Sequence, residues 1–273
     1  MPAIEVFAPA KINLSLHVTG QRDDGYHLLD SLVMFADVGD RITVAPAEQT
    51  SLRVTGPMAE DVPDDRRNLC WKAADAFGKP VAISLEKHLP AAAGIGGGSS
   101  DAAAVLTGME RLFARSSPVD LLMLGADVPV CRVGHAVRMT GIGEILHSMS
   151  MPPLQAVLVN PGVSVSTPEV FRRLPDKNNA AMTPCPVSGG PEAVLRWLAG
   201  QRNDLEPPAR AIQPVIGAVL DALWDLQGTR IARMSGSGAT CFAVFDGEDS
   251  AHAAAKALQS VHPDWWVRAC GLH

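Results

Sequence analysis

The stretch Pro90–Ala103, PAAAGIGGGSSDAA, contains four glycines within five residues and joins a strand-like segment to a helix-like one. Alternating apolar residues over 81–85 predict the strand. The run Ser99–Asp101 holds three residues of the N-cap type, which predicts that the helix begins there. Glycines let the backbone approach a ligand closely, and the N–H groups at a helix start favour an anion. This stretch therefore predicts a phosphate-binding loop that leads into a helix.

Two well-known phosphate loops do not fit these residues. A Walker A loop needs a Gly-Lys-Ser/Thr ending, and no lysine follows the glycines. A dinucleotide-binding fingerprint needs a third glycine where Ser99 stands. The alternative to phosphate binding is a tight turn that only connects two elements.

A lysine and an acid elsewhere in the chain suggest what happens to the phosphate. Lys11 and Asn13 lie two apart in an apolar strand-like segment, so they share one face of the strand. Asp127 lies in the apolar segment GADVP. Lys11 could instead be a solvated charge on an edge strand, and Asp127 could cap a helix or turn. Together with the loop, the two side chains form a set suited to phosphoryl transfer.

Composition excludes several classes of protein. The 273 residues include 47% hydrophobic residues, too many for a disordered chain, and 23 Lys+Arg against 29 Asp+Glu give a net charge of -6. A mildly acidic chain without a basic cluster is a poor candidate for binding nucleic acid. No apolar run is long enough for a membrane span, and the first residues do not resemble a signal peptide. Five scattered cysteines predict free thiols in the cytoplasm and no zinc site.

The order of the expected elements indicates an α/β or α+β fold. Strands are expected over 4–18, 41–44, 156–159, 230–234 and 240–245, with an apolar stretch over 28–35 and a turn at 37–40. Helices are expected over 68–77, 192–198, 212–226 and 250–260. A Met- and Pro-containing loop near residue 150 predicts a boundary between a domain of residues 1–150 and one of residues 151–273.

Three segments, Pro9–Leu14, Pro90–Ala103 and Met234–Thr240, resemble in order the three motifs of the GHMP kinases. Further segments resemble one branch of that family, and the likeness runs from about residue 7 to residue 245. They are Arg22–His27, Asn68–Leu69, Gly125–Pro129, Asn160–Gly162, Ser166–Pro168 and Asn203–Glu206. The acceptor of that branch is a methylerythritol linked to cytidine diphosphate.

The resemblance implies a fold and a reaction. We expect an N-terminal domain like ribosomal protein S5, a ferredoxin-like C-terminal domain and an active site in the cleft between them. The cofactors would be ATP and Mg²⁺. Asp127 would be the general base, and Lys11 would keep it charged. The ATP phosphates would bind to Pro90, Ala91, Ala92, Ala93, Gly94, Ile95, Gly96, Gly97, Gly98, Ser99 and Ser100.

The same resemblance implies how the acceptor is recognised. Tyr26, the single tyrosine of the chain, would stack on cytosine, and His27 would form a hydrogen bond with the edge of the base. Phe171 would lie on the other face of the base, and Asn13 would orient the reacting hydroxyl. The alternatives are that His27 is a structural histidine and that Phe171 is an ordinary core residue.

Two other functions stay open at this point. One is a GHMP kinase for another acceptor, of the mevalonate or homoserine type. The other is a nucleotide-binding sensor without activity, although the presence of both Lys11 and Asp127 argues against it. The segment from Leu106 to Gly125 is shorter than the family usually has, which leaves the shape of that side of the nucleotide pocket undefined.

Overall fold

Two compact units interleave along the chain in the computed structural model, which describes residues 2–186 and 190–273. The first unit takes residues up to Lys11, then Val38–Ala91 and Gly96–Gly134. The second takes Ile12–Asp37, Ala92–Ile95 and His135–His273. Strands β1 (Ile4–Gln21) and β2 (His27–Pro46) contribute residues to both units. A domain boundary near residue 150 stays a prediction.

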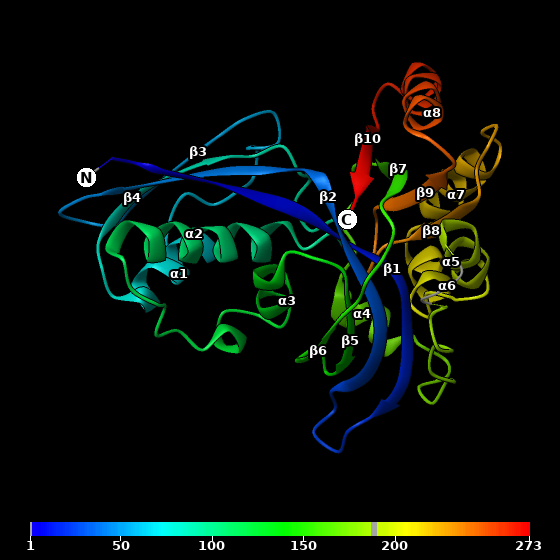
Figure 1. Cartoon of the computed structure of the whole chain (residues 1–273), viewed down its shortest axis with the longest axis horizontal. Coiled ribbons are helices and arrows are strands. Elements are labelled where there is room, and N and C mark those ends of the chain that lie inside the picture. Colours follow the sequence, from blue (N-terminus) through cyan, green and yellow to red (C-terminus); the bar gives the residue numbers. More distant parts are fainter. Residues whose placement is uncertain (1, 187–189) are drawn as a thin grey trace. The chain divides into compact units, whose positions relative to one another are not determined.

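The first unit packs helices on one face of a small sheet (Figure 1). Residues 41–46 of β2 pair antiparallel with β4 (Val81–Glu86), and β3 (Ser51–Thr55) pairs parallel with β4. Its helical elements are α1 (Leu69–Phe77), α2 (Gly97–Phe113), the 3-10 turn η1 (Leu121–Met123) and α3 (Val128–Val133). Helix α1 lies within the range predicted for it, 68–77, and its N-cap is Asn68, whose side chain accepts a hydrogen bond from the Cys70 N–H.

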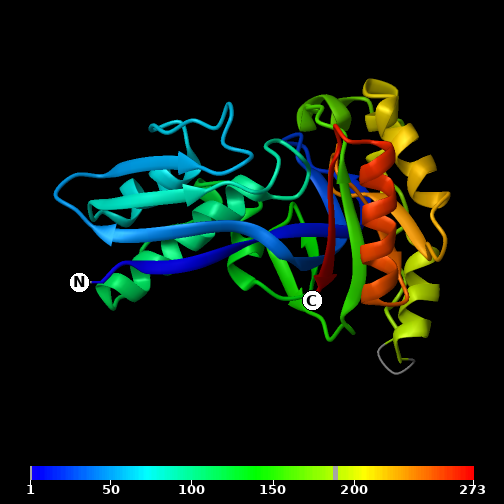
Figure 2. The same ribbon diagram turned by 90° about the horizontal axis from the view of Figure 1, so that it is seen from above.

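The second unit is built on an antiparallel sheet. Its strands run in the order β2, β10 (Trp266–Leu272), β7 (Leu154–Asn160), β9 (Cys241–Phe245) and β8 (Ile231–Met234). The hairpin of β5 (Val137–Gly141) and β6 (Ile145–Ser148) pairs with residues 29–33 of β2. The helices are α4 (Thr167–Arg172), α5 (Gly190–Ala199), α6 (Glu206–Ile212), α7 (Val215–Trp224) and α8 (Glu248–Val261). Helix α8 lies along β7 and β10 (Figure 2).

The core of the second unit explains why its helices lie where they do. Apolar residues of β7 and β9, including Val157, Val159 and Phe245, form one buried cluster with Val219 of α7 and Leu258 of α8. Burying such side chains stabilises the unit by about 1.5–3 kcal/mol each. The predicted helix over 212–226 is wrong in its start, because Pro214, at the N-cap of α7, separates it from α6.

The predicted turn at 37–40 is wrong, because β2 continues through these residues. Gly39 permits a close approach of β1, since a Cβ at this position would lie 2.2 Å from the carbonyl oxygen of Ala8. Asp40 is fully buried and accepts hydrogen bonds from the backbone N–H groups of His88 and Leu89. Residue types that are common in turns serve here as a close contact between strands and a buried acceptor.

The start of α2 also differs from the prediction. The helix begins at Gly97, with Gly96 as an N-cap in the left-handed region (φ 64°) and no side chain capping it. Ser99, Ser100 and Asp101 lie inside the first turns of the helix. The Ser100 hydroxyl donates to the Pro9 carbonyl at 2.8 Å, so this side chain fixes the helix to β1 and does not cap it.

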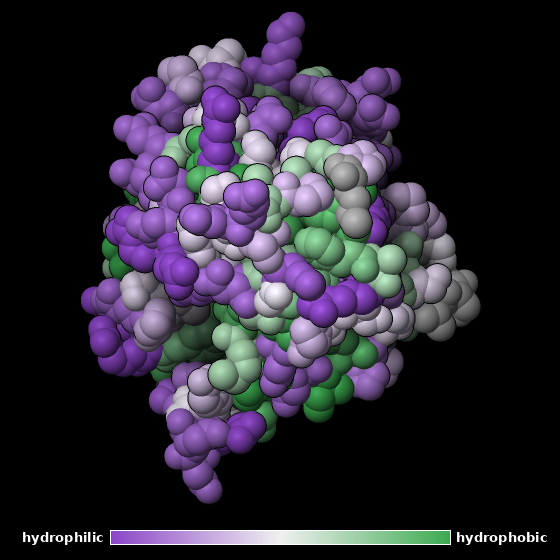
Figure 3. Space-filling model, turned by 90° about the vertical axis from the view of Figure 1, so that its left-hand side faces the viewer, coloured by the Kyte–Doolittle hydropathy of each residue, from purple (hydrophilic) through white to green (hydrophobic). Residues whose placement is uncertain are grey.

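Hydrophilic side chains cover most of the face shown in Figure 3, and apolar ones gather in separate patches. Scattered apolar side chains are normal on a protein surface. None of the helices described here has both the length and the apolar character that crossing a membrane requires.

Candidate active site

Lys11 and Asp127 form an ion pair in the first unit, with 2.8 Å between Lys11 Nζ and Asp127 Oδ1. The Lys11 side chain is only 5% exposed, whereas that of Asp127 is 39% exposed. A solvated edge-strand lysine is therefore excluded. Asp127 occupies the N-cap position of α3, but its side chain makes no capping hydrogen bond. The carboxylate thus faces both a cation and solvent, where it can accept a proton from a bound hydroxyl.

The glycine loop passes beside this lysine. A Cβ on Gly96 would lie 3.2 Å from Lys11 Cβ and 3.3 Å from Lys11 Cε, and Gly96 has the positive φ that glycine tolerates best. The first N–H groups of any helix lack intrahelical acceptors. In α2 no side chain caps these groups. Gly98 in the first turn is exposed. The turn therefore presents free donors and the positive end of a 17-residue helix to an anion.

Ser235 joins two other motifs within the second unit. Its hydroxyl accepts a hydrogen bond from the Asn13 backbone N–H at 3.0 Å and donates one to the Gly94 carbonyl at 3.1 Å. The Thr240 N–H donates to the Ala93 carbonyl at 3.1 Å. The loop carbonyls thus face the segment Met234–Thr240. This segment therefore holds Ala93 and Gly94 of the glycine loop in place through hydrogen bonds to their carbonyls.

Four further residues hold Met234–Thr240 in place, and the sequence reasoning assigned them no role. The Asn203 amide donates to the carbonyls of Met234 and Gly236, both at 2.8 Å. Asn160 donates to Thr240 Oγ1 at 2.9 Å, Thr167 contacts Ser237 at 2.7 Å, and Glu206 accepts from the Met234 N–H at 3.0 Å. Their motifs resemble those of the GHMP kinases. Nothing in their local pattern points to contacts with residues so distant in sequence.

Asn13 offers a free acceptor. Its Nδ2 donates to Ser31 Oγ at 2.8 Å, and the side chain is almost fully buried. Its Oδ1 has no hydrogen-bond partner within residues 2–186 and 190–273. Most buried polar atoms are hydrogen-bonded, so an acceptor left open here is suited to a ligand.

Tyr26, His27 and Phe171 lie in the second unit. Tyr26, the single tyrosine of the chain, is 60% exposed. The His27 and Phe171 rings stack with 4.6 Å between centroids and 26° between planes. Burial, followed by the charge of Lys177, lowers the pKa of His27, so its imidazole is neutral at neutral pH. Its buried Nε2 has no partner among the residues described, which a satisfied structural histidine would have.

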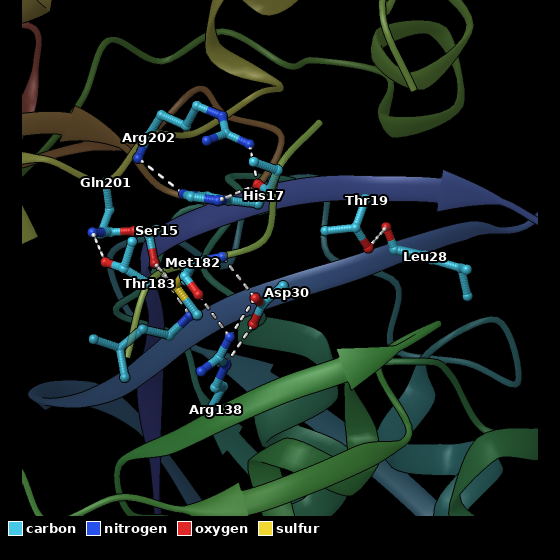
Figure 4. Close-up of polar contacts among 12 residues, drawn as sticks. Ser15, His17, Thr19, Leu28, Asp30, Arg138, Met182, Thr183, Gln201 and Arg202 are labelled. Atoms are coloured by element: carbon cyan, nitrogen blue, oxygen red, sulfur yellow. Dashed lines mark hydrogen bonds and ion pairs between the residues drawn. The ribbon is translucent and has the colours of Figure 1, made fainter. Parts of the chain in front are cut away.

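Hydrogen bonds hold residues 179–183 against β1 and β2, the strands that carry Asn13 and His27 (Figure 4). Asp30 of β2 receives a two-pronged ion pair from Arg138, at 2.6 and 2.7 Å, and the Met182 N–H at 2.8 Å. His17 of β1 contacts the Ala180 carbonyl at 3.0 Å through Nδ1. Burial lowers the pKa of His17, which keeps it neutral in this contact. The segment is thus a packed part of the unit next to the strands of the site.

Comparison with known proteins gives concordant findings. The family model for the N-terminal domain of the GHMP kinases matches residues 68–138, and the model for their C-terminal domain matches residues 188–264. A 4-diphosphocytidyl-2-C-methyl-D-erythritol kinase of Dinoroseobacter shibae is 58% identical over 264 residues, covering 96% of this chain and 92% of the relative. The kinase of the same name from Paramagnetospirillum magneticum is 48% identical and covers 98% of both chains.

Solved structures agree with these relatives. A crystal structure of 4-(cytidine 5'-diphospho)-2C-methyl-D-erythritol kinase is 36% identical, has a TM-score of 0.82 and covers 98% of this chain and 99% of its own. The homoserine kinase of Cytophaga hutchinsonii has a TM-score of 0.68 at 18% identity and covers 99% of this chain and 95% of its own. This second likeness concerns the fold alone.

Proposed function

Since this chain belongs to the GHMP kinases, and among them to the family of 4-diphosphocytidyl-2-C-methyl-D-erythritol kinases, we propose that its Lys11–Asp127 pair carries out the phosphoryl transfer of that family. The chain is an ATP-dependent kinase of the methylerythritol phosphate route to isoprenoid precursors. The fold prediction, a two-domain GHMP kinase of mixed α and β structure, is confirmed. The relatives favour this acceptor over mevalonate or homoserine.

The proposed reaction moves one phosphoryl group and one proton. The 2-hydroxyl of the acceptor attacks the γ-phosphorus of ATP, the bond from that phosphorus to the β,γ-bridging oxygen breaks, and ADP leaves. Asp127 accepts the hydroxyl proton, because its partly exposed carboxylate is open to a ligand. The buried ammonium of Lys11, 2.8 Å from that carboxylate, holds it in place and offsets charge on the attacking oxygen. This ion pair is the observation that carries the proposal.

ATP is proposed to bind with its phosphates at the first turn of α2, where the loop supplies backbone donors. No group of three or more His, Cys, Asp or Glu side chains in the described parts of the chain could hold a metal ion by itself. These residues fit a Mg²⁺ ion that would be bound mainly through the phosphate oxygens of ATP, as is usual for Mg²⁺ in kinase sites. There the ion would neutralise phosphate charge. The chain's own residues position the reactants.

Recognition of the acceptor is proposed to rest on the second unit. Tyr26 would stack on the cytosine ring, and the open Nε2 of neutral His27 would form a hydrogen bond with the base edge. Phe171, stacked on His27, would fix the orientation of the imidazole and lie beside the base. Asn13 would bind the reacting end through its unpaired Oδ1. Both reactants are small molecules, and we propose that the enzyme acts on them in the cytoplasm.

A coupled assay of ADP release tests the function. We expect turnover with 4-diphosphocytidyl-2-C-methyl-D-erythritol and none above background with mevalonate or homoserine. Cytidine diphosphate should compete with the acceptor and not with ATP. Turnover of mevalonate or homoserine in its place would refute the assignment of the acceptor, and a failure of cytidine diphosphate to compete would refute the role of Tyr26 and His27.

A further inference from the structure

A buried charge cluster in the first unit plays no part in the proposed reaction. The Lys87 ammonium contacts the carboxylates of Asp40 and Asp101, the latter with 2.9 Å between Nζ and Oδ2. The three side chains are 4%, 0% and 3% exposed. Lys87 follows β4, Asp40 belongs to β2, and Asp101 lies in the first turns of α2. The cluster therefore ties the start of the phosphate-binding helix to two strands.

The backbone contacts of the cluster reach the glycine loop itself. Asp40 Oδ1 accepts hydrogen bonds from the N–H groups of His88 and Leu89, at 2.6 and 2.9 Å, which fixes the chain directly after Lys87. A Cβ on Gly97 would lie 3.2 Å from Lys87 Nζ and 3.8 Å from Leu89 Cβ. Gly97, the first residue of α2, thus packs closely against the Lys87 ammonium. Movement of the cluster would move the N–H groups that are proposed to bind phosphate.

The charges of the cluster do not cancel without a proton. One ammonium faces two carboxylates, so the buried group would carry a net negative charge close to a site for an anion. Burial, the largest cause, and the neighbouring Asp40 raise the pKa of Asp101 to about 8. Asp101 Oδ1 is buried and has no partner among the described atoms. The other titratable groups facing Asp101, Cys70 of α1 and Cys131 of α3, have pKa values raised by burial and stay neutral.

We propose that Lys87, Asp40 and Asp101 form a positioning cluster for the phosphate-binding turn, and that Asp101 carries the proton that keeps this cluster neutral while ATP is bound. The proposal rests on the proposed function of the loop as the ATP site. The cluster touches neither ATP nor the acceptor. It acts through Gly97 and the backbone of α2.

A pH dependence of ATP binding follows. Below about pH 8 Asp101 is protonated and the cluster is neutral, whereas above that pH the lost proton leaves a buried negative charge near the phosphates. The Kd and KM for ATP should therefore rise above pH 8, by up to tenfold per pH unit. The kcat at saturating ATP should change much less, because the cluster does not take part in the transfer.

Asp101→Asn is the diagnostic variant, since its amide has nearly the same shape and cannot ionise. We expect its Kd for ATP to stay flat from pH 7 to 9.5, while that of the wild type rises. Asp75→Asn is the matched control, because Asp75 lies on the neighbouring α1, is 41% exposed and faces Arg66 only at 3.6 Å. Its profile should follow the wild type. Identical profiles for wild type and Asp101→Asn would overturn the proposal.

The wild-type enzyme provides a second measurement that does not depend on the variant folding. Calorimetric titration with ATP, without acceptor and in buffers of different ionisation enthalpy, counts the protons taken up on binding. At pH 8.5 we expect uptake of a substantial fraction of one proton. ATP binding without proton uptake would overturn the cluster proposal alone. A wild-type enzyme that binds no ATP at any pH would instead refute the proposed function of the loop.

Discussion

Replacing Gly94 by alanine tests whether the segment Met234–Thr240 sets the position of the glycine loop. Gly94 has a φ of +72°, which an L side chain rarely adopts. Its Cβ would also lie 2.6 Å from the Ser235 carbonyl oxygen, 2.7 Å from the Gly238 carbonyl oxygen and 2.8 Å from the Gly238 nitrogen. All three are backbone atoms, so no side-chain rotation relieves the contact. The loop or the facing segment must move.

The size of the effect follows from these distances. Reaching an ordinary contact of 3.4 Å from 2.6 Å requires a movement of about 0.8 Å. A misplacement of about 1 Å in a catalytic site can cost roughly 10²-fold in rate. The left-handed conformation adds about 1–2 kcal/mol of strain and overpacking about 1–3 kcal/mol, both lowering the free energy of unfolding. We expect kcat/KM for ATP to fall by about 10²-fold in Gly94→Ala.

Gly78→Ala is the matched control. Gly78 ends α1 with a φ of +78°, nearly that of Gly94, but a Cβ there meets nothing within 4 Å. Its replacement should lower the free energy of unfolding by about 1–2 kcal/mol through strain alone and leave kcat/KM unchanged. Urea unfolding and steady-state kinetics of the two variants separate the effects. Equal kcat/KM for Gly94→Ala and Gly78→Ala would refute the idea that this contact positions the loop.

Two other variants probe the acceptor site and the support of the loop. Tyr26→Ala should raise the KM for the cytidine-containing acceptor by about 5- to 150-fold, the equivalent of a stack worth about 1–3 kcal/mol, with an unchanged melting temperature because the ring is exposed. Tyr26→Phe should retain the wild-type KM, and an unchanged KM in Tyr26→Ala would remove the stacking role. Asn203→Ala should lower the free energy of unfolding, measured in urea, by about 1–3 kcal/mol for each of the Met234 and Gly236 carbonyls that loses its partner. It should also raise the KM for ATP, and an unchanged KM would disconnect Asn203 from the loop.

Local pattern was enough to predict the parts of the site that depend on neighbouring residues. Four glycines before a helix indicate an anion site wherever they occur, and the strand around Lys11 follows from its alternating apolar residues. Residue types alone suggested that Lys11 and Asp127 act together, but only the resemblance to the GHMP kinases implied that the two side chains lie close to each other. The two residues are distant in sequence, and no local rule brings them together.

The predictions that the structure contradicts failed because contacts between residues distant in sequence decide these positions. Gly39 and Asp40 are typical turn residues, yet they lie within a strand. Gly39 leaves room for the Ala8 carbonyl, and the Asp40 carboxylate pairs with Lys87. The role of Asn203 was not predicted for a similar reason, since its two acceptors lie about thirty residues further along the chain. In each case a tertiary contact overrides the local preference of the residue.

The kcat of Asp127→Asn, at saturating ATP and acceptor, tests the central claim most directly. Asparagine keeps the size of the side chain but cannot accept the hydroxyl proton, and it removes the negative charge that pairs with Lys11. Because a positioned general base contributes about 10²–10⁴-fold, we expect kcat to fall by at least 10²-fold. The Kd for ATP, measured by calorimetry, should stay within about twofold of the wild type, since the loop donors are untouched. A wild-type kcat in this variant would contradict the assignment of Asp127 as the base.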